Sequence, residues 1–171
     1  METGDSRAGR TYKQVWTNNM AQKREPTIRE NVKTVDYTKV SFKPDLRKFG
    51  MECLDADIVA LLTKRVYDIA GTSGGKYRVL LNGAEAPAKD FQAYVALYLR
   101  TKGQEEVPLP AITQAKSDRW EVVCSVSEGQ FSQVSFVNSI CTTKGGTHVD
   151  YIAAQIVAEI VKHITKKNKK T

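Results

Sequence analysis

The chain has 171 residues, of which 41% are hydrophobic, and it carries a formal net charge of +7. This length fits one domain, or one domain with part of another, and the hydrophobic fraction is sufficient for a core. Because no secretory signal pattern and no apolar run of about 18 residues occurs, we expect a soluble protein without a membrane partner. Three widely spaced cysteines, without a CxxC pair, indicate reduced and mostly buried thiols in an intracellular protein and no zinc site. They are Cys53, Cys124 and Cys141.

The positive charge is concentrated at the two ends of the chain. Residues 1–33 contain seven basic and four acidic residues, and residues 162–171 contain five lysines and no acidic residue. The long segment between them is close to neutral. A neutral body with basic ends indicates an anionic partner at those ends. A solvated tail without a partner is the alternative, and charge by itself leaves both open.

The first third of the chain predicts two strands. Residues 11–20 form a strand-like segment that runs into an Asn-Asn turn, and residues 37–43 alternate in a β-like pattern that Pro44 ends. The segment between them is polar and interrupted by Pro26, so it predicts an exposed connection. Trp16, like Trp120 later in the chain, lies in a strand-like segment and is predicted to be in the core.

The middle of the chain alternates helices with short strands. Residues 54–72 have apolar positions every three to four residues, acidic residues near the start, and Gly71 where the residue just past the helix would be. Residues 76–88 predict two short strands around an Asn82-Gly83 turn, a strong hairpin signal. Residues 90–101 predict a second helix, and the proline-containing segment 102–118 predicts an exposed connection.

The last third predicts an antiparallel pair of strands at 119–127 and 133–141, followed by a long helix. We expect the helix to begin near Thr147, with a capping box in which Asp150 stands in for the usual Glu. Its apolar face continues to Ile164, a length of roughly 27 Å. The mixture of strands and helices, without regular βαβ alternation, predicts an α+β fold built as a two-layer sandwich.

Reactive groups do not converge on an active site. No phosphate loop, dinucleotide fingerprint, HExxH or GxSxG motif is present. The candidate turn is Gly145-Gly146-Thr147-His148, where backbone N–H groups at a helix start could hold an anion. The more common role of such glycines is to let the chain reverse tightly between a strand and a helix, and we favour that structural role. His163 lies on a charged helix end and is expected to be solvated.

The lysine cluster at the end of the chain is the strongest functional signal. Lys166, Lys167, Lys169 and Lys170 begin where the apolar face of the last helix stops. Lysines at a helix C-terminus are favoured by roughly 0.3–1 kcal/mol each at best, and this cluster exceeds what capping needs. Duplex DNA carries one phosphate charge per about 1.7 Å of axis, so such a cluster would match it without reading sequence.

Residues 135–157, SFVNSICTTKGGTHVDYIAAQIV, resemble the strand-turn-helix signature of eukaryotic type II DNA topoisomerases, in a plant-like form. The stretches YKQVWTNNM, VSFKPDLRKFGM, DIVALLTKRVYDIAG, VLLNG and DRWEV agree in the same order. The resemblance covers nearly the whole chain. It implies that residues 1–34 are closing strands of a GHKL ATP-binding domain and that residues 35–171 are a transducer domain, a left-handed βαβ fold also found in a ribosomal protein.

The resemblance also implies a function. In such enzymes two ATPase regions dimerise on binding ATP and close a gate around a DNA duplex, and the transducer passes the nucleotide state to the cleavage core. The implied cofactors are ATP and Mg²⁺, the implied partners are double-stranded DNA and a second copy in a homodimer, and the implied location is the nucleus. The family's lysine-rich DNA contact maps onto Thr165, Lys166 and Lys167, with Lys169 and Lys170 adjacent.

Several parts of the family pattern are missing. The ATP-contacting asparagines, the glycine-rich lid, the Gln-Thr-Lys switch loop, the catalytic tyrosine and the metal-binding acidic residues do not occur. We therefore expect a fragment that binds no ATP and no metal and is inactive by itself. Cys141 stands where relatives often have a small apolar residue. The main alternative is a free-standing, non-enzymatic nucleic-acid-binding α+β module, and an independent small enzyme is a distant third.

Overall fold

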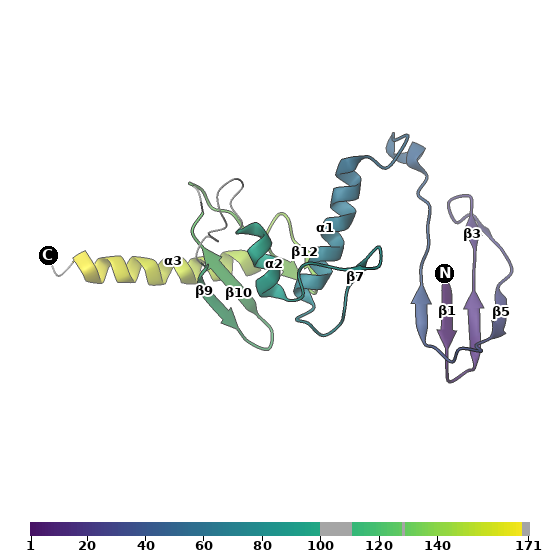
Figure 1. Ribbon diagram of the computed structural model, residues 1–171. Helices are drawn as coiled ribbons and strands as arrows, with labels where there is room; N and C mark the ends of the chain where they lie inside the picture. The colour runs from purple at the N-terminus through teal and green to yellow at the C-terminus, as the bar shows by residue number, and fades with distance from the viewer. Residues whose placement is uncertain (100–110, 128, 169–171) are drawn as a thin grey trace. The chain divides into compact units, whose positions relative to one another are not determined.

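The computed structural model describes residues 1–99, 111–127 and 129–168. The chain divides into two compact units, Met1–Asp55 and Ala56–Thr171 (Figure 1). Helices and strands are mixed along the chain, so the predicted α+β class is confirmed. No described helix combines the length and the apolar character needed to cross a bilayer.

The first unit is built on a four-stranded antiparallel sheet of order β5-β2-β1-β6. Oppositely charged cross-strand pairs support its register, since Glu2 lies between Lys13 and Lys39, and Arg10 lies between Asp5 and Glu30. The strands are β1 (Glu2–Asp5), β2 (Arg10–Lys13), β5 (Thr27–Glu30) and β6 (Tyr37–Lys39), and a separate ribbon joins β3 (Trp16–Thr17) to β4 (Gln22–Lys23).

The polar segment before residue 37 was predicted to be a connection, and this is wrong because it contains β4 and β5. All four residues of β5 are exposed, so the strand lacks the alternation of apolar and polar residues by which a strand is recognised. β6 pairs with β1, so residues just beyond the predicted domain boundary at 34 join the first compact unit. The division at 34 into two family domains stays a prediction. A short 3₁₀ helix, η1 (Leu46–Phe49), follows.

The second unit contains the three α-helices. Its elements are α1 (Ala56–Thr72), β7 (Leu80–Leu81), β8 (Ala84–Glu85), α2 (Phe91–Tyr98), β9 (Ala111–Lys116), β10 (Glu121–Ser125), β11 (Phe136–Val137), β12 (Ile140–Cys141) and α3 (Thr147–Asn168). The predicted hairpin is confirmed, because Asn82 and Gly83 have φ of 51° and 85° and connect the paired β7 and β8. Such two-residue turns need positive φ at both positions.

The predicted pairing of the two later strands is wrong. β10 pairs with β9, which lies in the segment expected to be a connection, and β11 pairs with β12 within the predicted single strand. The reason is a tight turn at Asn138 and Ser139, which have φ of 50° and 64° and reverse the chain after only two residues of β11.

α1 and α2 pack through a glycine. Gly71 is buried inside α1 and not past its end, which corrects the prediction, and a Cβ added to it would lie 2.5 Å from Tyr94 Cβ. The glycine therefore lets the two helices approach closely. Asp90 caps the start of α2, and its carboxylate accepts a hydrogen bond from Ala93 N at 2.8 Å. The buried apolar residues of the described chain are Ala70, Ala86, Ala88 and Tyr94.

Both tryptophans are more exposed than predicted. Trp16 is 36% exposed and Trp120 is 42% exposed, so neither is a core residue of this chain. Trp120 contacts Tyr151 of α3, with ring centroids 6.3 Å apart. A large aromatic residue in a strand-like segment is therefore partly covered here by a neighbouring helix and partly left to solvent.

Candidate nucleic-acid interface

The glycine turn carries the chain from β12 into α3. Gly145 and Gly146 have φ of 72° and 150°, the positive values that glycine adopts without a steric penalty, in keeping with the structural role expected for the turn. Gly145 N donates to Thr142 O at 2.9 Å, and the Gly146 carbonyl accepts from Val149 N at 2.9 Å. The first hydrogen bond connects the turn to the residue that follows β12, and the second belongs to the first turn of α3.

Side chains around this turn are already engaged with one another. Ser135 Oγ lies 2.6 Å from Thr142 Oγ1, which lies 3.2 Å from His148 Nε2. A Cβ added to Gly146 would lie 3.1 Å from the His148 ring, so the imidazole lies against the turn. The predicted capping box is wrong, because Thr147 is already the first helical residue and its hydroxyl makes no hydrogen bond within the described chain.

α3 is a long helix with little cover. Its 22 residues correspond to a length of about 33 Å, and none of them is buried. The C-terminal half of its apolar face is 52–57% exposed. These residues are Val157, Ile160, Val161 and Ile164. Figure 1 shows this half of α3 extending beyond the β9–β10 hairpin, so the helix presents its end away from the small sheets of its own unit.

The end of α3 carries exposed positive charge. Lys166 and Lys167 lie in its last turn, and neither forms an ion pair with any described residue. Lys162 forms an ion pair with Glu159 at 3.4 Å. Lys162 also lies four residues before Lys166, and two like charges at this spacing destabilise a helix by about 0.2–0.5 kcal/mol. The predicted contacts Lys169 and Lys170 lie outside the described residues.

Thr165 has a different environment from the lysines. Its hydroxyl donates to Val161 O at 2.9 Å, a bond back to its own helix. A hydroxyl bound in this way has lone pairs free but has used its proton, so it would have to break that bond before donating to a phosphate. Lys166 and Lys167 are therefore better placed than Thr165 to donate hydrogen bonds to a phosphate. His163 is exposed, as expected for a residue on the charged end.

A buried polar network was missed in the sequence. Asp68 of α1 is 1% exposed and accepts hydrogen bonds from Lys64 Nζ at 2.8 and 3.0 Å and from Tyr94 OH at 2.6 Å. Tyr94 OH lies 3.0 Å from Tyr98 OH. A Lys–Asp pair four residues apart is common on the exposed surface of a helix, so the Lys64–Asp68 pair by itself does not indicate a buried network. The hydrogen bond from Tyr94, which comes 26 residues after Asp68, shows that the pair is part of one.

This network shifts the pKa of two of its members. Burial and the hydrogen bond to Asp68 raise the pKa of Tyr94 well above 10. Burial lowers the pKa of Lys64, but the hydrogen bond to Asp68 and nearby acidic groups more than offset this, and the pKa is raised. Lys64 Nζ also lies 3.9 Å from Cys141 Sγ of β12. The raised pKa values favour the charged form of Lys64 and the protonated form of Tyr94. In these forms the network connects α1, α2 and β12.

The cysteines are free, and they are less buried than predicted. Cys53 is exposed, and Cys124 and Cys141 are half-buried. Cys53 lies in the segment between η1 and α1. Among the described residues, no three or more His, Cys, Asp or Glu side chains come together as metal ligands would.

Comparison with known proteins gives a consistent family. A family model described as DNA gyrase B matches residues 88–171. The chain is 54% identical to DNA topoisomerase 2 of Arabidopsis thaliana over 171 residues and 49% identical to that of Pisum sativum over 170 residues. In each case the match covers 99% of this chain and 12% of the relative, so the chain spans about an eighth of their length.

Solved structures agree with the sequence matches. The ATPase region of Saccharomyces cerevisiae topoisomerase II superposes with a TM-score of 0.86 at 46% identity, over 96% of this chain and 42% of that one. The ATPase and transducer domains of DNA topoisomerase II from Balamuthia mandrillaris give a TM-score of 0.83 at 36% identity, over 97% and 41%. By sequence and by fold, this chain belongs to the type II DNA topoisomerase family and corresponds to part of its ATPase region.

Proposed function

We propose that the chain serves as the transducer part of an ATP-dependent type II DNA topoisomerase, where it couples ATP binding and hydrolysis to closure of a gate around duplex DNA. The observation that carries this proposal is α3, a long helix whose exposed end bears Lys166 and Lys167 without ion-pair partners in the described chain. A helix is a stiff element, so a change at its start would be transmitted to the lysines about 30 Å away.

In this proposal the lysines bind DNA through its phosphates. Lys166 and Lys167 project from the last turn, and Lys169 and Lys170 continue the cluster in sequence. Contacts of this kind position a protein on a duplex and carry no information about base sequence. The like charges within the last two turns disfavour the free helix and would be neutralised by phosphate, which favours binding over a purely solvated end.

ATP and Mg²⁺ would be held elsewhere in the enzyme. The described residues bring no three carboxylate, His or Cys side chains together, and the His148 ring lies against the glycine turn before α3. These residues therefore do not fit a nucleotide with its metal, and we expect no ATP hydrolysis by this chain alone. Assembly as a homodimer and location in the nucleus belong to the same proposal, since both follow from the proposed DNA-passage activity.

The test is the salt dependence of duplex binding by the whole 171-residue chain. With three or four phosphate contacts, log K should fall with log salt at a slope of roughly −3, because each contact contributes about −0.9. Replacing Lys166 and Lys167 by Ala should reduce that slope by about two, for every duplex sequence alike. Fluorescence anisotropy with a labelled duplex between 50 and 200 mM salt measures this.

The matched control is the double variant Lys43→Ala, Lys48→Ala. Both lysines are exposed in the first unit, and the variant loses the same two charges. It should keep the wild-type slope. If both double variants lose the same slope, binding follows net charge and the proposed site is wrong. The alternative, a free-standing nucleic-acid-binding module, predicts the same slopes, and the flanking transcript sequence separates it from the proposed function.

A further inference from the structure

A cationic hollow lies in the second unit, formed by the C-terminal end of α1, the loop that follows it, and the β7–β8 hairpin. Its volume is about 310 Å³, at the lower end of the range for small-molecule sites. Small residues form its base, namely Ala70, Ala86 and Ala88, which are 0–5% exposed. A larger side chain at any of these positions would take up part of the hollow.

The loop beside the hollow is held in shape by its backbone. Gly74 and Gly75 have φ of 62° and 74°, conformations that residues with a side chain adopt at a cost. The hydroxyl of Ser73, which is 5% exposed, donates to Ala70 O at 2.8 Å and accepts from Gly75 N at 3.2 Å. On the opposite side, Ala86 N donates to Val79 O at 3.0 Å. Both walls are thus formed before any ligand arrives.

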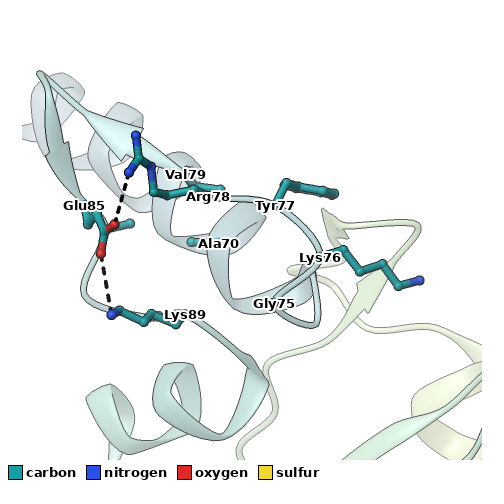
Figure 2. A pocket seen from close by; sticks show the side chains of 10 residues that line it. Ala70, Gly75, Lys76, Tyr77, Arg78, Val79, Glu85 and Lys89 are labelled. Atoms are coloured by element: carbon teal, nitrogen blue, oxygen red, sulfur yellow. Dashed lines mark ion pairs between the residues drawn. The ribbon is translucent and has the colours of Figure 1, made fainter.

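The charges of the hollow are unbalanced. Lys76, Arg78 and Lys89 line it together with a single carboxylate, Glu85, so the local net charge is +2. Glu85 is paired with Arg78 at 3.8 Å and with Lys89 at 3.5 Å. Figure 2 shows these two cations reaching the carboxylate from different sides while Lys76 points away from it. Ion pairs this long between exposed side chains contribute little to stability, so they can be exchanged for others.

We propose that this hollow binds a phosphate group, with Arg78 and Lys89 as its ligands and Glu85 as the resident anion that the phosphate displaces. The guanidinium of Arg78 suits a phosphate because its N–H groups match two phosphate oxygens. A dianionic group matches the two positive charges of Arg78 and Lys89. The source of the phosphate is a small phosphate-bearing molecule or the backbone of a polynucleotide. This site is separate from the lysine end of α3.

The test is a titration of the whole ¹⁵N-labelled chain with inorganic phosphate at pH 7.5 and constant ionic strength. The backbone amides of Val79, Ala86 and Lys89 should shift and saturate. Two unit charges about 4 Å apart in water change an affinity about fivefold, and a dianion doubles that free energy, which gives about 25-fold. The variant Glu85→Gln should therefore bind phosphate up to about 25-fold more tightly, and Arg78→Gln with Lys89→Gln should bind at least tenfold more weakly.

The matched control is Lys116→Gln, which breaks another exposed Lys–Glu pair of 3.5 Å outside the hollow and should leave phosphate binding unchanged. Absence of saturable shifts in the wild-type chain, unchanged shifts in the Arg78/Lys89 variant, or weaker binding by Glu85→Gln would each overturn the proposal. A duplex added to the Lys166→Ala, Lys167→Ala variant identifies the source. Shifts at the hollow with the duplex assign it to a polynucleotide, and shifts with inorganic phosphate alone assign it to a small molecule.

Discussion

Replacing Tyr94 by Phe is the most direct test of the network that connects α1, α2 and β12. Tyr94 is 3% exposed, and its hydroxyl donates to Asp68 Oδ1 at 2.6 Å. The substitution removes one oxygen atom and keeps the ring, which packs edge-on against Phe136 at 5.6 Å between centroids. Any loss of stability therefore reports the hydrogen bond and little else.

The expected loss is about 2 kcal/mol. Hydrogen bonds to a charged group contribute about 1.5–3 kcal/mol, and the acceptor here is a carboxylate that is 1% exposed. The loss stays below the upper end of that range because Lys64 still donates to both oxygens of Asp68. In a unit of about 100 residues, 2 kcal/mol lowers Tm by roughly 8 °C.

Thermal melting followed by circular dichroism measures this shift, with Tyr98→Phe as the control. Tyr98 is 48% exposed, and its hydroxyl reaches the network only through Tyr94, so its loss should change stability by less than about 0.5 kcal/mol. A Tm for Tyr94→Phe within 1–2 °C of wild type would show that the hydroxyl bond contributes little. The same result from both variants would also refute the reasoning.

The pH dependence of stability provides a second readout of the same change. Burial and the bond to Asp68 raise the pKa of Tyr94 in the folded chain above its ordinary value of 10. A raised folded pKa gives stability that is fully present below pH 10 and is lost as the pH rises beyond it, since the unfolded chain ionises first. The stability gap between wild type and Tyr94→Phe should therefore be constant below pH 9 and narrow above pH 10.

Two further predictions concern the turn before α3 and the first unit. Gly145→Val places a β-branched residue at φ of 72°, so we expect a cost of about 1–3 kcal/mol and a Tm lower by several degrees, whereas an unchanged Tm in both Gly145→Val and Gly146→Val would favour an anion-binding role for the turn. The pKa of Glu2 is lowered by the Tyr37 hydroxyl, and that of Asp36 by the Ser6 backbone N–H. Lowered carboxyl pKa values give stability that is lost as the pH falls through them, so the first unit should melt at lower temperature below about pH 4, and Glu2→Gln with Asp36→Asn should reduce that dependence.

The helices were predictable because their signals are local. The three-to-four-residue spacing of apolar residues identified α1 and α3, Asp90 precedes α2, and the Asn82-Gly83 pair identified the hairpin. Each of these signals acts within a few residues. The Gly145-Gly146 turn was found for the same reason, and both glycines do adopt positive φ.

The strand pairings could not be predicted, because they depend on residues distant in sequence or without an apolar pattern. β5 is exposed throughout, and β9 lies in a segment with two prolines nearby. Gly71 was misplaced for a related reason, since a glycine at the end of a helical pattern most often terminates the helix. Only the position of Tyr94, more than twenty residues later, shows that this glycine is needed for packing.

If the second unit works as proposed, different residues should determine its thermal stability and its binding to DNA. Asp68 and Tyr94 lie at the junction of α1 and α2, whereas Lys166 and Lys167 lie at the far end of α3, which buries none of its residues. At a temperature where both variants are folded, Tyr94→Phe should lower Tm and leave the salt slope of duplex binding unchanged. Lys166→Ala with Lys167→Ala should do the reverse, because exposed lysines contribute little to folding. A Tyr94→Phe variant with a reduced slope would mean that the phosphate contact depends on the packing of α1 against α2, and the lysine end would then not be an independent binding site.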